Sequence, residues 1–235
     1  VSFDGKWGVF DEDFLQFFAH KLSDFKQPFF STLFTISSHA PFTIPEKYKG
    51  KFPKGTTEIH ESIAYSDFAL EKFFKSAEKK AWYKNTIFVI TADHTSSSGA
   101  EEVYKNNVGK FRIPIMFYVP NDPTMVGKSS KNFQQIDILP SLMDYLQLNG
   151  KIISYGKSYK SDKDFVVNYL DNIYNLNKGD YYMAFDGVKS LGLYNWKTDP
   201  LLKENLVNKD KIKTQEMESF MKAYIQSFNK RVSKN

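Results

Sequence analysis

Two residues able to bind a metal ion, Asp93 and His94, stand at the end of the apolar run 87–90, after Thr91 and Ala92. The run is β-branched and aromatic, which is typical of a buried central strand. In open α/β sheets, ligands bind beyond the carboxyl ends of the strands, so the pair stands where a site is expected. A carboxylate and an imidazole suit a divalent cation, but two ligands alone do not complete a catalytic metal site. The alternative is an ordinary histidine that is bonded to a nearby backbone group.

A second histidine, His39, follows another expected strand. Pro28 ends a helix expected over 11–25 and begins a strand over 29–36, which leads into Ser37-Ser38-His39-Ala40-Pro41-Phe42. If both strands lie in one parallel sheet, the two histidine-bearing loops emerge at the same edge. This geometry couples His39 to Asp93 and His94 in one candidate site.

The spacing of apolar residues predicts an α/β fold. Helical spacing occurs over 11–25, 59–82 and 136–146, and apolar runs occur over 29–36, 87–90 and 113–119. Their alternation over 11–148 favours βαβ units and a mainly parallel sheet flanked by helices. After residue 150 the pattern changes to a small antiparallel hairpin, 181–185 with 191–196, and a C-terminal amphipathic helix. We therefore expect an α/β part over 1–150 and an antiparallel edge over 151–235 that packs on it.

Composition limits the classes of function. The 235 residues contain 41% hydrophobic residues and carry a net charge of +5, which describes a globular chain with a sizeable core. Arginine occurs only at Arg112 and Arg231, and this argues against a nucleic-acid partner. The absence of cysteine excludes thiol nucleophiles and thiolate metal sites. No apolar run approaches the roughly 18 residues of a membrane span. The chain starts at Val1 without Met, and we interpret it as a piece of a longer protein.

Motifs along nearly the whole chain carry a family resemblance. They are Trp7-Gly8-Val9-Phe10-Asp11-Glu12, Thr35-Ile36-Ser37-Ser38-His39-Ala40-Pro41-Phe42, Tyr65-Ser66-Asp67, Thr91-Ala92-Asp93-His94, Arg112-Ile113-Pro114-Ile115, Gln135-Ile136-Asp137-Ile138-Leu139-Pro140, Gly156-Lys157-Ser158 and Leu193-Tyr194-Asn195-Trp196. In this order the chain resembles the C-terminal half of the sulfatase-like branch of the alkaline phosphatase superfamily. The resemblance is strongest to lipoteichoic acid synthase-like phosphoglycerol transferases, and it implies an alkaline phosphatase-like fold.

The resemblance also implies roles for the candidate residues. Asp93 and His94 would be two ligands of a divalent ion (Mn, Zn, Mg or Ca), and His39 would be a catalytic and substrate-binding residue at the phosphate or the leaving oxygen. In the family a Thr, a Ser or a modified Cys, activated by the metal, attacks phosphorus or sulfur and forms a covalent intermediate. That nucleophile and a further acidic ligand lie in the N-terminal half, outside this chain. Thr95 and the serines after it do not stand at the nucleophile's position. We therefore expect no nucleophile here and no turnover by this fragment alone.

The function implied is that of a phosphotransferase acting on a phospholipid head group or an anionic envelope polymer. The parent protein would sit in the cytoplasmic membrane, with this domain outside the cytoplasm. A sulfatase remains the enzymatic alternative, although the residues around His39 favour the transferase branch. A non-catalytic, envelope-binding relative is the second alternative, and the retention of Asp93 and His94 speaks against it. We interpret Trp7 as a core or lid aromatic, and its alternative role is to shape a substrate pocket. We interpret Arg112 as an ion-pair partner, and its alternative role is to clamp a phosphate.

Overall fold

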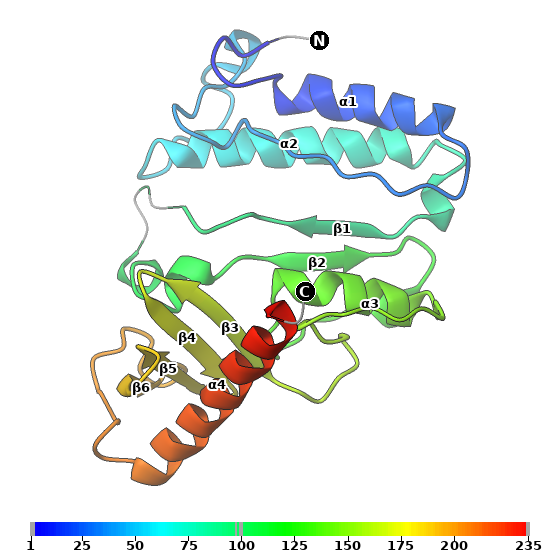
Figure 1. Ribbon diagram of the computed structural model, residues 1–235. Helices are drawn as coiled ribbons and strands as arrows, with labels where there is room; N and C mark the ends of the chain where they lie inside the picture. The colour runs from blue at the N-terminus through cyan, green and yellow to red at the C-terminus, as the bar shows by residue number, and fades with distance from the viewer. Residues whose placement is uncertain (1–2, 97, 99–100, 234–235) are drawn as a thin grey trace. The chain divides into compact units, whose positions relative to one another are not determined.

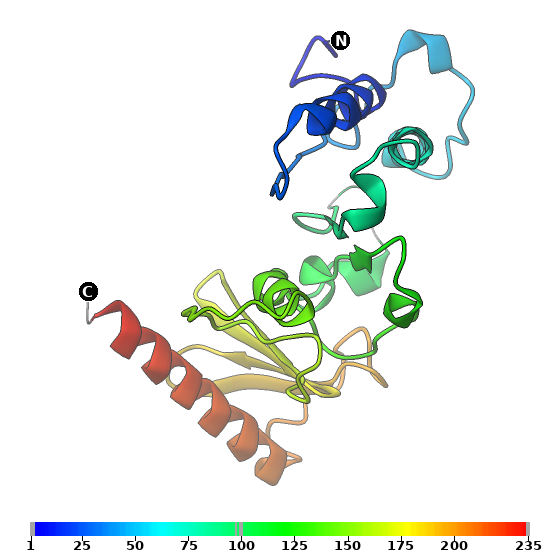
Figure 2. The same cartoon turned by 90° about the vertical axis from the view of Figure 1, so that its right-hand side faces the viewer.

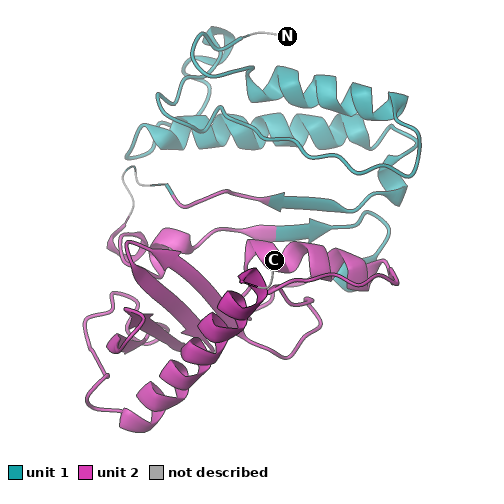
Figure 3. Cartoon of the chain, viewed as in Figure 1, with its two compact units in different colours: residues 1–90, 96–100, 116–126 teal, residues 91–95, 101–115, 127–235 magenta. Residues whose placement is uncertain are grey.

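The structure, a computed structural model, describes residues 3–96, 98 and 101–233 and divides into two compact units. Unit 1 comprises residues 1–90, 96–100 and 116–126, and unit 2 comprises residues 91–95, 101–115 and 127–235 (Figure 3). Each unit has a hydrophobic cluster of its own. Ser97, one of the serines that follow Thr95, lies outside the described residues.

Unit 1 is built on two helices that lie side by side, α1 (Asp11–Lys21) and α2 (Ile59–Ala77) (Figure 1). Apolar residues three and four positions apart give each helix one face that can be buried against the other. Leu15 and Ala19 of α1 pack there with Ala69 and Phe73 of α2. The ring of Phe73 also meets that of Phe88 edge to face, so the helices and the strand that follows them share one core.

The strand before Asp93 is β1 (Phe88–Thr91), and it pairs with β2 (Ile115–Tyr118). The two strands run in opposite directions (Figure 1), as is seen from the end of β1, which lies beside the start of β2. The Thr91 hydroxyl donates to the Pro114 carbonyl at 3.0 Å, while the Phe88 ring stacks on the Tyr118 ring at the other end. The boundary between the two units falls within both strands.

Unit 2 contains α3 (Ile138–Tyr145), a four-stranded sheet and the long α4 (Lys211–Val232). The sheet has the order β3 (Phe165–Leu170), β4 (Ile173–Lys178), β5 (Tyr181–Phe185) and β6 (Ser190–Asn195). Figure 2 shows α4 along one face of this sheet. Met217 and Met221 of α4 are fully buried in the same cluster as Leu176, Met183 and Leu193 of the sheet. The C-terminal helix is therefore held by its apolar stripe.

Short 3-10 helices join these elements. They are η1 (Leu22–Asp24), η2 (Glu46–Tyr48), η3 (Tyr83–Asn85), η4 (Glu102–Tyr104), η5 (Gly109–Phe111), η6 (Pro123–Met125) and η7 (Gln135–Asp137).

The α/β class, the hairpin after residue 180 and the C-terminal helix are confirmed. The mainly parallel pairing is not found among the described strands, because β3 to β6 pair antiparallel throughout. Their connections explain this: Asp171 and Asn172 alone join β3 to β4, whereas a parallel crossover needs a dozen residues or more. The pair β3 and β4 was not expected from the sequence.

The strand expected over 29–36 is also not formed. Exposure alternates over 29–34 as it does in a strand, and Phe29 and Leu33 pack on the unit 1 cluster. Within the described part of the chain, however, no other segment hydrogen-bonds to the backbone of residues 29–35. A strand requires a paired neighbour, and the alternating pattern alone does not supply one.

Candidate functional site

The side chains of Asp93 and His94 converge just beyond the end of β1. The carboxylate of Asp93 accepts the His94 N–H at 2.9 Å through Oδ1, which leaves Oδ2 available. The His94 Nδ1 lies 3.0 Å from the Thr95 carbonyl oxygen, and because a carbonyl only accepts, Nδ1 carries the proton. The free Nε2 lies 3.5 Å from Asp93 Oδ2. Two ligand atoms of the kinds that bind divalent cations therefore lie side by side. The hydrogen bond from Nδ1 to the Thr95 carbonyl oxygen fixes the orientation of the His94 ring.

Both side chains are accessible, with 70% of His94 and 55% of Asp93 exposed. Within the described ranges, no group of three or more His, Cys, Asp and Glu residues is placed to hold a metal ion. The donor set, one carboxylate oxygen and one imidazole nitrogen, fits two coordination positions of a divalent ion and leaves the others to be filled.

The side chains of Gln135 and Thr95 hold the backbone of this segment, and the sequence assigned this task to neither of them. Gln135 of η7 donates through Nε2 to the carbonyl oxygens of Ala92 and Asp93, at 2.8 and 3.3 Å. The Thr95 hydroxyl bonds to the carbonyl oxygens of Gly109 and Arg112, at 3.1 and 2.7 Å. Thr95 therefore secures the loop, and its exclusion as the nucleophile stays a prediction. The only signal for Gln135 in the sequence was its place at the start of the motif 135–140.

A buried ion pair anchors η7 in turn. Asp137 is fully buried, and its Oδ2 accepts the Lys157 ammonium at 2.7 Å and the Gln134 N–H at 3.0 Å. Its Oδ1 accepts the Lys157 N–H at 2.7 Å. The Lys157 ammonium also donates to the Phe165 carbonyl oxygen at 2.9 Å, at the start of β3. The helix that presents Gln135 is thus tied to the four-stranded sheet.

His39 lies in unit 1, in a turn that follows residue 36. The His39 N–H donates to the Ile36 carbonyl oxygen at 2.9 Å, and the Phe42 N–H donates to the His39 carbonyl oxygen at 2.8 Å. The His39 Nδ1 lies 2.8 Å from the Ala40 carbonyl oxygen, so Nδ1 again carries the proton, and Nε2 is the nitrogen of this exposed ring that can accept from or bind a ligand. His39 and His94 thus share one arrangement, a ring fixed through Nδ1 by the next residue's carbonyl.

Trp7 is 63% exposed and its ring lies 5.2 Å from the His39 ring, centroid to centroid, in an edge-on contact. The structure contradicts a core position for Trp7, since it is a surface aromatic beside His39, and its role as a lid aromatic stays a prediction. Arg112 is exposed and makes no ion pair with another described residue, which contradicts its interpretation as an ion-pair partner. Its carbonyl group serves the Thr95 contact instead.

The structure brings Asp93 and His94 together, whereas His39 belongs to the other unit. A common site for all three residues remains a prediction.

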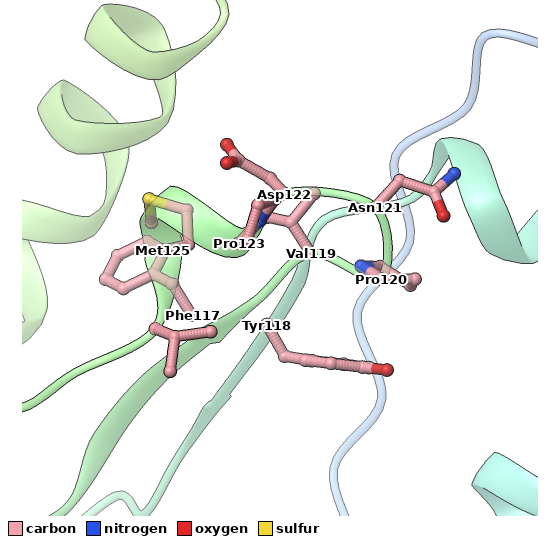
Figure 4. A pocket seen from close by; sticks show the side chains of 9 residues that line it. Phe117, Tyr118, Val119, Pro120, Asn121, Asp122, Pro123 and Met125 are labelled. Carbon is pink, nitrogen blue, oxygen red and sulfur yellow. The ribbon is translucent and has the colours of Figure 1, made fainter.

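A cavity of about 280 Å³ in unit 1 lies elsewhere, beyond the end of β2 (Figure 4). One continuous segment, from Phe117 to Val126, supplies its walls, and these are mostly apolar. None of the candidate residues contributes to it, so it is not the candidate site.

Among the described helices, none is long and apolar enough to cross a membrane.

Comparison with known proteins gives lipoteichoic acid synthases as relatives. Lipoteichoic acid synthase 1 of Bacillus subtilis (strain 168) is 28% identical over 217 residues, which cover 84% of this chain and 32% of the relative. Lipoteichoic acid synthase of Staphylococcus aureus (strain USA300) is 27% identical over 158 residues, which cover 61% of this chain and 24% of the relative.

Among solved structures, a protein in the alkaline phosphatase superfamily from Vibrio parahaemolyticus is similar with a TM-score of 0.70 and 27% identity. That match covers 84% of this chain and 50% of the other. The putative sulfatase yidJ from Bacteroides fragilis has the same fold, with a TM-score of 0.69 at 18% identity and coverage of 93% and 58%.

The chain thus spans about a third or less of the length of these synthases and about half of the solved chains. The sulfatase family model matches residues 2–148, which is more than half of the chain. The chain therefore belongs to the sulfatase family and is a lipoteichoic acid synthase-like member of the alkaline phosphatase superfamily.

Proposed function

We propose that this chain is the C-terminal part of a metal-dependent phosphoryl-transfer enzyme of the phosphoglycerol transferase type. Its substrate is a phospholipid head group or an anionic envelope polymer, and it acts outside the cytoplasmic membrane. The similarity to lipoteichoic acid synthases over 84% of the chain supports this class over a sulfate ester hydrolase. The nucleophile and the remaining metal ligands belong to a preceding part of the same protein.

The observation that carries the proposal is the pair of free ligand atoms at the end of β1. Asp93 Oδ2 and His94 Nε2 lie 3.5 Å apart, and both side chains are anchored through their other polar atoms. In this family a bound divalent ion supplies Lewis-acid stabilisation of the phosphoryl oxygens and favours the ionised form of a nucleophilic hydroxyl. Asp93 and His94 are the residues of this chain that hold such an ion.

His39 contributes a hydrogen bond to the substrate. With Nδ1 committed to Ala40, the Nε2 atom accepts when the ring is neutral and donates when it is protonated. A protonated Nε2 neutralises charge on a phosphoryl oxygen or delivers a proton to the departing oxygen, and such steps contribute about 10²- to 10⁴-fold in rate. The Trp7 ring packs edge-on against the His39 ring and adds to the contacts that hold it.

The test uses the protein in its full length and measures diacylglycerol release from phosphatidylglycerol vesicles with added Mn²⁺. We expect D93N and H94Q to reduce turnover to near background and H39Q to reduce it by about 10²-fold or more. H20Q is the matched control, since His20 is an exposed residue on α1 and should leave the rate unchanged.

Three results would contradict the proposal. Release of sulfate from an aryl sulfate, without diacylglycerol release, would place the protein among the sulfatases. Binding of vesicles without turnover would support a non-catalytic envelope-binding relative. Turnover by the 235 residues alone would show that the nucleophile lies within this chain.

A further inference from the structure

We infer that Asp11, at the start of α1, is a positioning residue for His39. The inference rests on the proposed role of His39 and adds a residue to which neither composition nor motif assigns a task. Among the described residues, the hydrogen bonds of Asp11 go to Ile36, Ser37 and Ser66, and none goes to the His39 side chain. It acts on the backbone that leads into the turn that carries His39.

The Asp11 side chain is 1% exposed and joins three segments of unit 1. Its Oδ1 accepts two backbone N–H groups, from Ile36 at 3.0 Å and from Ser37 at 2.9 Å. Its Oδ2 accepts the Ser66 hydroxyl of α2 at 2.9 Å. In return, the Asp11 N–H donates to the Ser37 hydroxyl oxygen at 3.0 Å. Four hydrogen bonds thus fix the position of residues 36 and 37 relative to both helices.

A carboxylate is well suited to this position. A charged acceptor forms stronger hydrogen bonds to N–H and O–H donors than a neutral acceptor does. Asp11 also occupies the first turn of α1, where the positive end of the helix dipole stabilises a negative side chain. Burial without a neighbouring cation is tolerated only when the oxygens are satisfied, and here three donors satisfy them.

Residues 36 and 37 determine where His39 lies. The Ile36 carbonyl oxygen accepts the His39 N–H, and the turn closes through the bond from Phe42 N–H to the His39 carbonyl oxygen. Phe42 has a φ of +60°, an unfavourable backbone conformation for a residue with a side chain. Such a turn keeps its shape only if its surroundings hold it. Because the His39 ring is bonded to Ala40 within the same turn, its orientation follows the backbone that Asp11 anchors.

The neighbouring acid provides a matched control. Glu12 is 7% exposed and lies in the same helical turn, but its carboxylate binds Lys47, Lys72 and the Tyr48 hydroxyl. None of these partners belongs to residues 36–42. E12Q therefore removes a buried charge next to Asp11 without releasing the His39 turn, and we expect it to lower stability while kcat stays unchanged.

The experiment is a double-mutant cycle in the full-length protein, with phosphatidylglycerol as substrate. We expect D11A to lower kcat by about 10- to 100-fold and to change KM much less, because a displaced group loses alignment rather than substrate affinity. D11N retains an acceptor for both N–H groups and should restore kcat to within a few-fold. In an H39Q background, D11A should cause no further loss, because Asp11 acts only through His39.

Hydrogen exchange in α1 and α2 serves to confirm that each variant is folded. If D11A fails to fold, S37A takes its place in the cycle, since it removes only the bond between Ser37 and the Asp11 N–H. An equal loss in the wild-type and H39Q backgrounds would overturn the inference, as would an unchanged kcat in D11A. If H39Q itself leaves the rate unchanged, the proposed role of His39 fails. This result differs from an equal loss in both backgrounds and from an unchanged kcat in D11A, which concern Asp11 alone.

Discussion

Replacement of Lys157 by methionine tests how unit 2 supports the segment that carries Asp93 and His94. Lys157 and Asp137 form an ion pair at 2.7 Å, with side chains 8% and 0% exposed. Methionine keeps much of the side-chain volume but removes the ammonium group. The carboxylate then retains only two partners, the backbone N–H groups of Gln134 and residue 157.

The expected loss follows from that burial. Removing one partner of a buried ion pair leaves an uncompensated charge and costs about 3–5 kcal/mol. D137N instead removes the negative charge beside the buried Lys157 ammonium, whose other acceptor is the Phe165 carbonyl oxygen. We expect it to lower the free energy of unfolding by about as much as K157M does. The double variant D137N/K157M buries no charge, so its loss should fall short of the sum by about 2 kcal/mol or more.

Hydrogen exchange of peptides from β4 and β5, followed across a urea titration, measures this loss within unit 2. A local measurement is needed because a chain of two compact units need not unfold in one step. K160M is the control, since the pair that Lys160 forms with Asp144 is 54% and 35% exposed and should contribute far less. A loss below about 1 kcal/mol in K157M, or strict additivity in the double variant, would refute the reasoning.

Three further predictions concern an exposed carboxylate on α4, the core of unit 1 and the candidate site. The ammonium groups of Lys178 and Lys213 lower the pKa of Glu216 from 4.5 to about 2, so its stabilising effect should be present above pH 4.5 and vanish towards about pH 2. The melting temperatures of wild type and E216Q should therefore differ at pH 7 and converge as pH falls through that range. F73A should destabilise unit 1 by about 3–5 kcal/mol in urea titrations, because Phe73 is 5% exposed. Q135A, which frees the Ala92 and Asp93 carbonyl groups, should weaken Mn²⁺ binding by about 10-fold in titrations followed by electron paramagnetic resonance.

Helices and strands that show a regular spacing of apolar residues could be predicted from the sequence. The helices α1, α2 and α4 and the hairpin of β5 and β6 follow from apolar spacing and from the Asp186-Gly187 turn. The strand β1 follows in the same way, and with it the place of Asp93 and His94.

Features that depend on distant partners could not be predicted. Residues 29–36 have the alternation of a strand, but pairing depends on a neighbour that no local pattern specifies. In β4, the buried Asn175 and Asn177 interrupt the apolar pattern, and the Tyr182 hydroxyl in β5 donates to the side-chain Oδ1 of Asn175.

The residues that hold the candidate residues in place also depend on partners distant in the sequence. Asp11 meets Ser37 across 26 positions and Ser66 across 55, and Gln135 meets Ala92 across 43. The residue types that can bind metal or substrate are visible in the sequence, whereas the residues that hold them in place become visible only after folding.

The most direct test of the central claim, that Asp93 and His94 bind the metal, is pulsed electron paramagnetic resonance of the full-length protein loaded with Mn²⁺ alone. A directly coordinated imidazole gives a ¹⁴N modulation that changes when the histidines are labelled with ¹⁵N. We expect this signal in the wild type and in H39Q, and we expect its loss in H94Q together with weaker binding in D93N. A signal that persists in H94Q, or Mn²⁺ affinity unchanged in both H94Q and D93N, would contradict the claim.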